Sequence, residues 1–253
     1  MTSSSLIVSR LRAAGCVFAE DEAQLLIEAA ATPIDLAAMV DRRVAGLPLE
    51  HVLGWAEFLG RRIVVDPGVF VPRRRTEHLA RQAIELAAPG AVVVDLCCGS
   101  GAVGAAIAVA VPGVVLSASD IEPAAVRCAR RNHTGDVYEG DLYEPLPTSL
   151  RHRIDVLVAN APYVPTDAVG LMPPEARCHE PLVALDGGAD GLDVIRRVTE
   201  AAPEWLAPGG HLLFETSVGQ APTAMAVVTR AGLTPRMTRD EEIGATVVIG
   251  TLG

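Results

Sequence analysis

Glycines and an acidic residue follow one of the predicted strands. The apolar run 91–96, AVVVDL, leads into a loop in which Gly99, Gly101 and Gly104 match the pattern G-x-G-x-x-G. Taken alone, this pattern indicates a dinucleotide site, where glycines let the backbone approach a pyrophosphate at a helix N-terminus. Asp95 precedes the loop, and its charge would repel a pyrophosphate by about 2 to 4 kcal/mol at an intermediate dielectric. A cationic ligand fits better, and S-adenosylmethionine offers a sulfonium and an ammonium group without any phosphate.

Two more carboxylates are expected at the same edge of the sheet. Asp120 ends the predicted strand 114–120, where a carboxylate can accept both hydroxyls of a ribose. Asp141 ends the next predicted strand, where a side-chain acceptor can meet an adenine amino group. A plain turn with Asp as a helix cap, and a nicotinamide or flavin site, stay open as alternatives. The residues expected to contact the cofactor are Asp95, Cys97, Gly99, Gly101, Asp120, Ile121, Asp141, Leu142 and Asn160.

An amide side chain ends a further predicted strand. The apolar run 154–159, IDVLVA, is followed by the turn Asn160-Ala161-Pro162-Tyr163. Such an amide is either a turn residue satisfied by its own backbone or a group that faces a ligand. In the second case, the Asn160 side-chain carbonyl and the Ala161 backbone carbonyl can accept both N–H groups of a neutral amine and orient its lone pair toward a methyl donor. Pro162 would keep the turn rigid, and Tyr163 would add an apolar wall or a hydroxyl contact.

The rest of the sequence predicts the elements that would position these groups. Residues 1 to about 45 have helical spacing of apolar residues and predict short amphipathic helices. Two β-rich runs around the turn signal 66–68, Asp-Pro-Gly, predict a hairpin. From about residue 76, strands and helices alternate, which predicts an α/β fold with a parallel-type sheet covered on both faces. The expected strands are AVVVDL, VVLSASD, DVYEGD, IDVLVAN, HLLFET and ATVVIGTL, and the expected helices are 101–110, 122–132, 191–206 and 218–231.

Composition disfavours several classes of protein. The formal net charge of −10 disfavours a nucleic-acid partner, because such affinity comes largely from Lys and Arg on phosphates. The densest basic cluster fits a solvated face or a local binding surface and comprises Arg61, Arg62, Arg73, Arg74 and Arg75. The histidines and cysteines lack metal-ligand spacing, so we expect no metal site. No apolar run reaches the roughly 18 residues of a membrane span, and the five cysteines are typical of reduced thiols, so we expect a cytoplasmic protein without a membrane partner.

The turn at Asn160 resembles the Asn-Pro-Pro-Tyr motif of amino methyltransferases that modify glutamine amides or nucleic-acid bases. Ala161 replaces the first proline, at an expected cost of about 0.4 to 1 kcal/mol in preorganisation. Further segments resemble the release-factor glutamine methyltransferases, and together they span about 46 to 250. These segments are GLPLEHVLGWAEFLG, FVPRRRTEHL, EPLVALDGGADGLDVIRR and LLFETSVGQ.

This resemblance implies a Rossmann-like, seven-stranded class I methyltransferase domain preceded by a small helical domain and a β-hairpin. We expect a substrate-engaging helical domain at 1–54, a hairpin connector at 55–75 and the S-adenosylmethionine-dependent domain at 76–253. The implied reaction is methyl transfer to a glutamine amide in the Gly-Gly-Gln loop of peptide-chain release factors.

The sequence also departs from this family. Arg74 and Arg75 replace the usual Pro-Glu, and Ala245 replaces an Arg, so another protein with an exposed glutamine is also considered as the acceptor. Two alternatives stay open: an amino methyltransferase acting on a nucleic-acid base, and a cofactor-binding relative without methylation activity.

Overall fold

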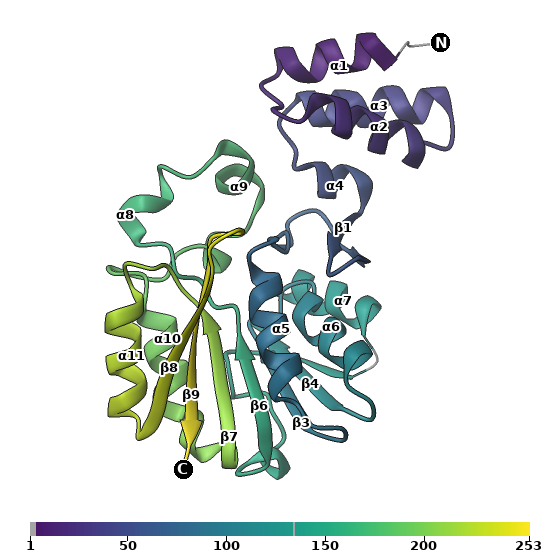
Figure 1. The fold of residues 1–253 in the computed structure, drawn as a ribbon. Helices are drawn as coiled ribbons and strands as arrows, with labels where there is room; N and C mark the ends of the chain where they lie inside the picture. The colour runs from purple at the N-terminus through teal and green to yellow at the C-terminus, as the bar shows by residue number, and fades with distance from the viewer. Residues whose placement is uncertain (1–3, 134) are drawn as a thin grey trace.

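The chain begins with a bundle of helices that stands apart from a large sheet (Figure 1). The computed structural model describes residues 4–133 and 135–253. The bundle contains α1 (Ser4–Ala13), α2 (Ala19–Ala29), α3 (Pro33–Val44) and the short α4 (Leu49–Leu53). Thr32 caps α3 by accepting the backbone N–H of Asp35 at 3.1 Å, and Pro33 suits the first helical position because it needs no donor there. The bundle has its own apolar core, which includes Ile7, Leu11, Leu26 and Val40.

A two-stranded hairpin follows the bundle, but the predicted turn position was wrong. β1 (Trp55–Phe58) pairs antiparallel with β2 (Arg61–Val64), so the turn lies at Leu59 and Gly60. Both turn residues have positive φ, 49° and 71°, which suits a tight two-residue hairpin. The turn signal at 66–68 instead starts the segment that leads to the first sheet-covering helix, with the Val69 N–H bonded to the Asp66 carbonyl at 3.1 Å.

Within the described residues, the main sheet has seven strands in the order β5-β4-β3-β6-β7-β9-β8. The pairs from β5 to β7 are parallel, and β9 is antiparallel to both of its neighbours. The sequence did not predict β8, an edge strand with alternating exposure that contains Pro235. Proline is tolerated there because an edge strand leaves one row of backbone donors unpaired. The bounds are β3 (Val92–Leu96), β4 (Val115–Asp120), β5 (Asp136–Glu139), β6 (Ile154–Ala159), β7 (Leu206–Glu215), β8 (Leu233–Asp240) and β9 (Ala245–Leu252).

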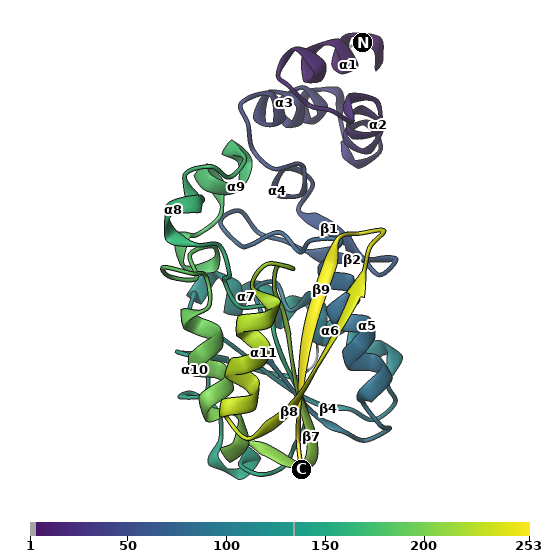
Figure 2. The same ribbon diagram turned by 60° about the vertical axis from the view of Figure 1, so that its left-hand side comes forward.

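Helices cover both faces of this sheet, which confirms the predicted fold class (Figures 1 and 2). One face packs against α5 (Thr76–Leu86), α6 (Ala102–Ala110) and α7 (Pro123–Asn132). The other face packs against α10 (Asp193–Ala201) and α11 (Ala221–Arg230). Successive side chains of β3 point to opposite faces of the sheet. Val93 therefore packs on the side of α5 and α6, and Val94 packs on the side of α10 and α11.

The irregular segment 161–190 contains two short helices, α8 (Thr166–Val169) and α9 (Pro174–His179). Both helices lie beyond the carboxyl ends of the parallel strands, on the side of the helical bundle (Figure 2). Short 3₁₀ turns occur at Thr148–Leu150, Leu182–Ala184 and Ala202–Glu204. No helix among the described residues is long and apolar enough to cross a membrane.

Candidate active site

A pocket opens at the carboxyl edge of the parallel strands. Asp95 in β3, Asp120 at the end of β4 and Asn160 directly after β6 all line it. Asp141, two residues beyond β5, lines it as well. These residues are far apart in sequence and converge because neighbouring parallel strands present their carboxyl ends at one edge.

The glycine loop directs its backbone N–H groups at carboxylates. The Gly99 N–H donates to Asp120 at 2.8 Å, and the Gly104 N–H donates to Asp95 at 2.9 Å. These donors are the groups that would otherwise hold a pyrophosphate, so the arrangement disfavours a dinucleotide. Gly101 has a φ of 76°, and a Cβ there would lie 2.9 Å from the His133 ring, so the loop requires glycine at this position.

Asp95 is a buried carboxylate without a cationic partner among the described residues. It is 1% exposed, and burial raises its pKa to about 7, while the N–H of Gly104 lowers the pKa and the charge of Asp120 raises it. A positive charge in the pocket would stabilise the carboxylate form. The site therefore suits a cationic ligand.

Asp120 and Asp141 hold different contacts. Asp120 accepts the N–H of Gly99 on Oδ2 and the N–H of Glu122 on Oδ1 at 2.9 Å, and burial raises its pKa. Asp141 accepts a hydrogen bond from Nη2 of Arg197 at 2.6 Å, and both residues line the pocket. Arg197 orients one oxygen of Asp141, and the second oxygen makes no hydrogen bond with the part of the chain that the structure describes.

The first two residues of the turn after β6 carry polar groups that a ligand can use. Within residues 4–133 and 135–253, neither the Asn160 side chain nor the Ala161 carbonyl makes a hydrogen bond. Carbonyls further along are occupied, since Nε2 of Gln220 donates to the Tyr163 carbonyl at 2.9 Å and the Gly187 N–H donates to the Val164 carbonyl at 2.8 Å. The amide of Asn160 is therefore not a turn residue satisfied by its own backbone, and it lines the pocket.

Comparison with known proteins agrees with this geometry. Residues 61–172 match the model of the family described as Methyltransferase small domain. The chain is 39% identical over 226 residues to a release factor glutamine methyltransferase of Geobacter sulfurreducens, covering 86% of this chain and 78% of the relative. The chain therefore belongs to the release factor glutamine methyltransferase family.

The chain is also similar to a methyltransferase with a small-molecule substrate in its name and to a solved methyltransferase structure. A 4-amino-L-phenylalanine/4-methylamino-L-phenylalanine methyltransferase of Streptomyces pristinaespiralis is 36% identical, covering 76% of this chain and 69% of the relative. A solved methyltransferase structure from Pyrococcus furiosus superimposes with a TM-score of 0.58 at 15% identity, covering 86% of this chain and 98% of that one. The structural likeness shows the methyltransferase fold and thereby the predicted architecture.

The predicted site residues divide into two groups in this family member. Those that line the pocket are Asp95, Cys97, Gly99, Asp120, Ile121, Asp141, Leu142, Asn160 and Pro162. Gly101, Ala161 and Tyr163 do not line it. Gly101 precedes α6, Ala161 is 2% exposed within the turn, and the Tyr163 hydroxyl donates to Glu215 at 2.6 Å.

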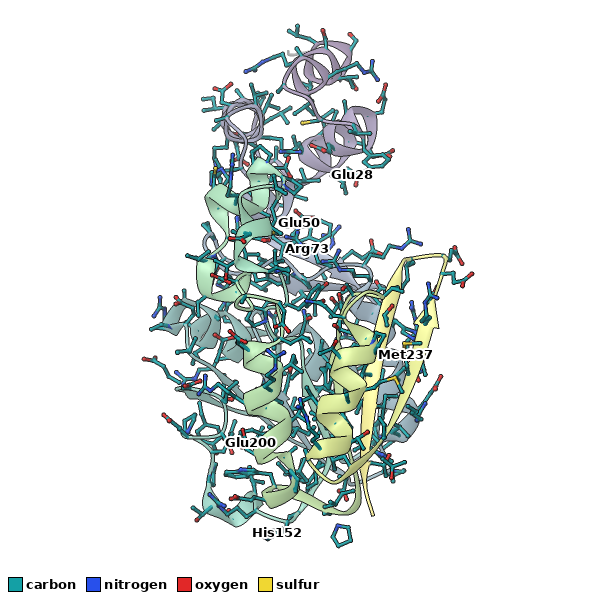
Figure 3. All side chains as sticks on the ribbon, turned by 90° about the vertical axis from the view of Figure 1, so that its left-hand side faces the viewer. Glu28, Glu50, Arg73, His152, Glu200 and Met237 are labelled. Carbon is teal, nitrogen blue, oxygen red and sulfur yellow. The ribbon has the colours of Figure 1, made fainter. Side chains whose placement is uncertain are left out.

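Sequence reasoning missed two walls of the pocket. One is the extended segment after the hairpin, where Val69, Phe70 and Pro72 line the pocket. The other is the stretch 181–184, of which Pro181, Val183 and Ala184 line it. Glu180, whose side chain is 1% exposed, joins these walls by accepting the Val71 N–H at 3.1 Å and Nη2 of Arg73 at 2.6 Å. Figure 3 places Arg73 between the helical bundle and the sheet. Arg73 and Glu180 are far apart in the sequence, so no local pattern could have predicted their contact.

Proposed function

We propose that this protein transfers a methyl group from S-adenosylmethionine to the side-chain amide nitrogen of a glutamine in a peptide-chain release factor. The observation that carries the proposal is a carboxylate-lined pocket that also contains the Asn160 amide, with neither this amide nor the adjoining Ala161 carbonyl hydrogen-bonded within the described residues. The relatives named as release factor glutamine methyltransferases favour this function over methylation of a nucleic-acid base and over cofactor binding without catalysis.

The pocket residues fit the proposed cofactor. S-adenosylmethionine supplies an activated methyl group on a positively charged sulfur. Asp95 would stabilise the positive charges of the ligand, and Asp120 would accept the ribose hydroxyls. Asp141, held by Arg197, would accept the adenine amino group with its second oxygen. Cys97, Gly99, Gly101, Ile121 and Leu142 would shape the walls around these contacts.

The turn after β6 would position the acceptor nitrogen. The side-chain carbonyl of Asn160 and the main-chain carbonyl of Ala161 would each accept one N–H of the glutamine amide, which aims the nitrogen lone pair at the methyl group. Both acceptors are uncharged, which matches a neutral amide. After transfer the nitrogen is positively charged, so its proton can leave to water without a strong general base. Pro162 and Tyr163 would fix and flank this turn.

Each part of the chain would have its own role in the reaction. We assign engagement of the acceptor protein to the helical domain 1–54, connection to the hairpin segment 55–75, and cofactor binding and transfer to 76–253. The helices α8 and α9 lie on the side of the sheet that faces the bundle (Figure 2), and Glu175 of α9 pairs with Arg43 of the bundle at 2.7 Å. An acceptor loop that enters on this side would reach the pocket edge. We place this reaction in the cytoplasm, where release factors act.

The test is methyl transfer with defined acceptors. The purified protein is incubated with methyl-labelled S-adenosylmethionine and a release factor, and the modified residue is located by mass spectrometry. We expect label on the glutamine of the Gly-Gly-Gln loop and none on a release factor in which that glutamine is replaced by alanine. Equal labelling of both proteins, or no labelling, contradicts the proposal. The arylamine specificity named for the Streptomyces pristinaespiralis relative makes 4-amino-L-phenylalanine the second acceptor to test.

A further inference from the structure

A buried carboxylate lies beside the turn that carries Asn160. β6 and β7 are parallel, and Ala159 pairs with Phe214, so Asn160 and Glu215 each follow a paired residue at neighbouring strand ends. Glu215 ends β7 and is 1% exposed. Its position places a second polar group at the level of the acceptor turn.

The carboxylate of Glu215 is held by donors from two other segments of the chain. Its Oε1 accepts the Tyr163 hydroxyl at 2.6 Å and Nε of Arg75 at 2.8 Å. Its Oε2 accepts the Thr76 hydroxyl at 2.7 Å. Arg75 supplies the countercharge that a buried carboxylate needs. With donors on both of its oxygens, Glu215 is suited to hold the neighbouring side chains in place.

Tyr163 is fixed at both of its ends by the same region. Its hydroxyl donates to Glu215, and its carbonyl accepts from Nε2 of Gln220, in the loop after β7. The guanidinium of Arg75 lies 5.7 Å from the centre of its ring. A clamp on the last residue of the turn restricts the backbone of the residues before it, including the Ala161 carbonyl.

We propose that Glu215 is a positioning residue for methyl transfer, which fixes the Tyr163 side chain and thereby the acceptor-orienting turn that begins at Asn160. This inference rests on the proposed function for its kinetic consequence, but the contact itself can be tested without any acceptor. Arg75 supports this position of Glu215 by compensating its charge. Thr76, which donates to Glu215, also lines the pocket.

The kinetic test uses Glu215→Gln, Tyr163→Phe and the double variant. Each single change should lower the rate of transfer to a release factor by about 10- to 100-fold, because small misplacements of reacting groups have effects of this size. Affinity for S-adenosylhomocysteine, measured by calorimetry, should stay within about threefold of the wild-type value. The double variant should be no slower than the slower single variant, because both changes break one contact. Glu200→Gln is the matched control on the exposed surface of α10 (Figure 3).

Two kinetic outcomes overturn the proposal. If the losses from the two single changes multiply in the double variant, Glu215 does not act through Tyr163. If cofactor affinity falls together with the rate, the residue has a general structural role. Tyr163→Phe leaves Glu215 paired with Arg75 and Thr76, so this variant keeps the test valid if Glu215→Gln does not fold. A wild-type rate in Tyr163→Phe also overturns the proposal.

A second readout is independent of the acceptor. Burial raises the pKa of Tyr163, and the charge of Glu215 raises it further. The chain has three tyrosines, so labelled ring carbons can be followed by NMR and assigned with Tyr163→Phe. In Glu215→Gln the ring Cζ resonance of Tyr163 should move, because its hydroxyl loses a charged acceptor, while those of Tyr138 and Tyr143 stay unchanged. An unchanged Tyr163 resonance overturns the contact, and a shift supports it even if the wild-type protein methylates no release factor.

Discussion

Arg43 and Glu175 join the helical bundle to α9, with Nη1 of Arg43 at 2.7 Å from Oε1 of Glu175. The same guanidinium binds Glu22 through Nε at 2.6 Å and through Nη2 at 3.1 Å. Glu175 lies in the first turn of α9, and Glu180 directly follows that helix. One short helix thus carries a contact to the bundle and, at its other end, the carboxylate that joins the pocket walls.

Removing the Arg43 side chain should strongly destabilise the bundle. The Arg43 side chain is 6% exposed and that of Glu22 is 12% exposed, so Arg43→Ala leaves a buried carboxylate without its partner. The expected loss in the free energy of unfolding is about 3 to 5 kcal/mol, measured by urea denaturation. Arg10→Ala is the control, because its ion pair with Asp41 is largely exposed and should contribute only about 0 to 1 kcal/mol. Similar losses in both variants would contradict the buried contact.

Asp95 should make stability depend on pH. Burial raises its pKa from 3.8 to about 7, so between these values the folded protein retains a proton that the unfolded chain has released. The contribution of Asp95 to the free energy of unfolding therefore falls as the pH rises through this window and is constant above it. Denaturation of wild-type protein and Asp95→Asn across this range measures the difference. The difference in the free energy of unfolding between wild type and Asp95→Asn should change between pH 3.8 and about 7 and stay constant above this range.

The same group should act on the cofactor in the opposite direction. A cationic ligand stabilises the Asp95 carboxylate, so affinity for S-adenosylmethionine should rise with pH up to about 7 and then become constant. Asp95→Asn should bind more weakly and lose most of this dependence. Calorimetry in buffers of different ionisation enthalpy reports the proton released on binding. Equal proton release by wild-type protein and variant would remove Asp95 from the cation-binding role.

Asp120→Ala should weaken cofactor binding. Hydrogen bonds to a charged acceptor contribute about 1.5 to 3 kcal/mol, which corresponds to an affinity loss of about 10- to 150-fold. Because Asp120 also accepts the Gly99 N–H, the loss could reflect a changed loop. An S-adenosylhomocysteine analogue without the ribose hydroxyls separates the effects, since it should bind wild type and variant with similar affinity. If Asp120→Ala also binds this analogue much more weakly than wild type does, Asp120 only supports the loop.

The sequence was sufficient where a local pattern carries the information. An apolar run followed by Asp or Asn predicted Asp95, Asp120 and Asn160 at strand ends, because the parallel topology then brings them to one edge. It was insufficient where a contact joins distant segments. Glu180 and Arg73 are separated by 107 positions, and nothing local marks either residue as the other's partner.

Local signals also failed at the hairpin and at the sheet edge. The predicted turn relied on an Asp-Pro-Gly sequence, whereas the observed turn uses Leu59 in a left-handed conformation that its side chain disfavours. β8 was missed because an edge strand with charged residues and Pro235 lacks the apolar run of a buried strand. Tertiary pairing with β9 stabilises it.

Glu180→Gln should accelerate the release of bound cofactor. The carboxylate joins the segment of Val71 and Arg73 to the stretch 181–184, and both line or adjoin the pocket. Glutamine loses the charge that binds Arg73, so the two walls should separate more often. We expect the dissociation rate of S-adenosylhomocysteine to rise by about 10-fold or more, measured by stopped-flow displacement. Glu175→Gln, in the helix that directly precedes Glu180, is the matched control, and an equal increase there would assign the effect to α9 as a whole.

Asn160→Ala should remove methyl transfer while cofactor affinity stays within about threefold of the wild-type value. The side-chain carbonyl would accept one N–H of the acceptor amide, and alanine offers no acceptor in its place, so the nitrogen lone pair loses its direction. Because this amide makes no hydrogen bond within residues 4–133 and 135–253, its removal breaks none in the described part of the chain.

Asn160→Asp separates orientation from charge at the same position. Aspartate keeps an oxygen that can accept the acceptor N–H, but it brings a negative charge beside the cationic methyl donor. We expect Asn160→Asp to raise the affinity for S-adenosylmethionine relative to that for S-adenosylhomocysteine, the product that lacks the sulfonium charge, and to retain more transfer than Asn160→Ala. If both variants lose cofactor affinity in parallel with transfer, Asn160 maintains the pocket itself, and the free amide at the end of β6 does not orient the acceptor.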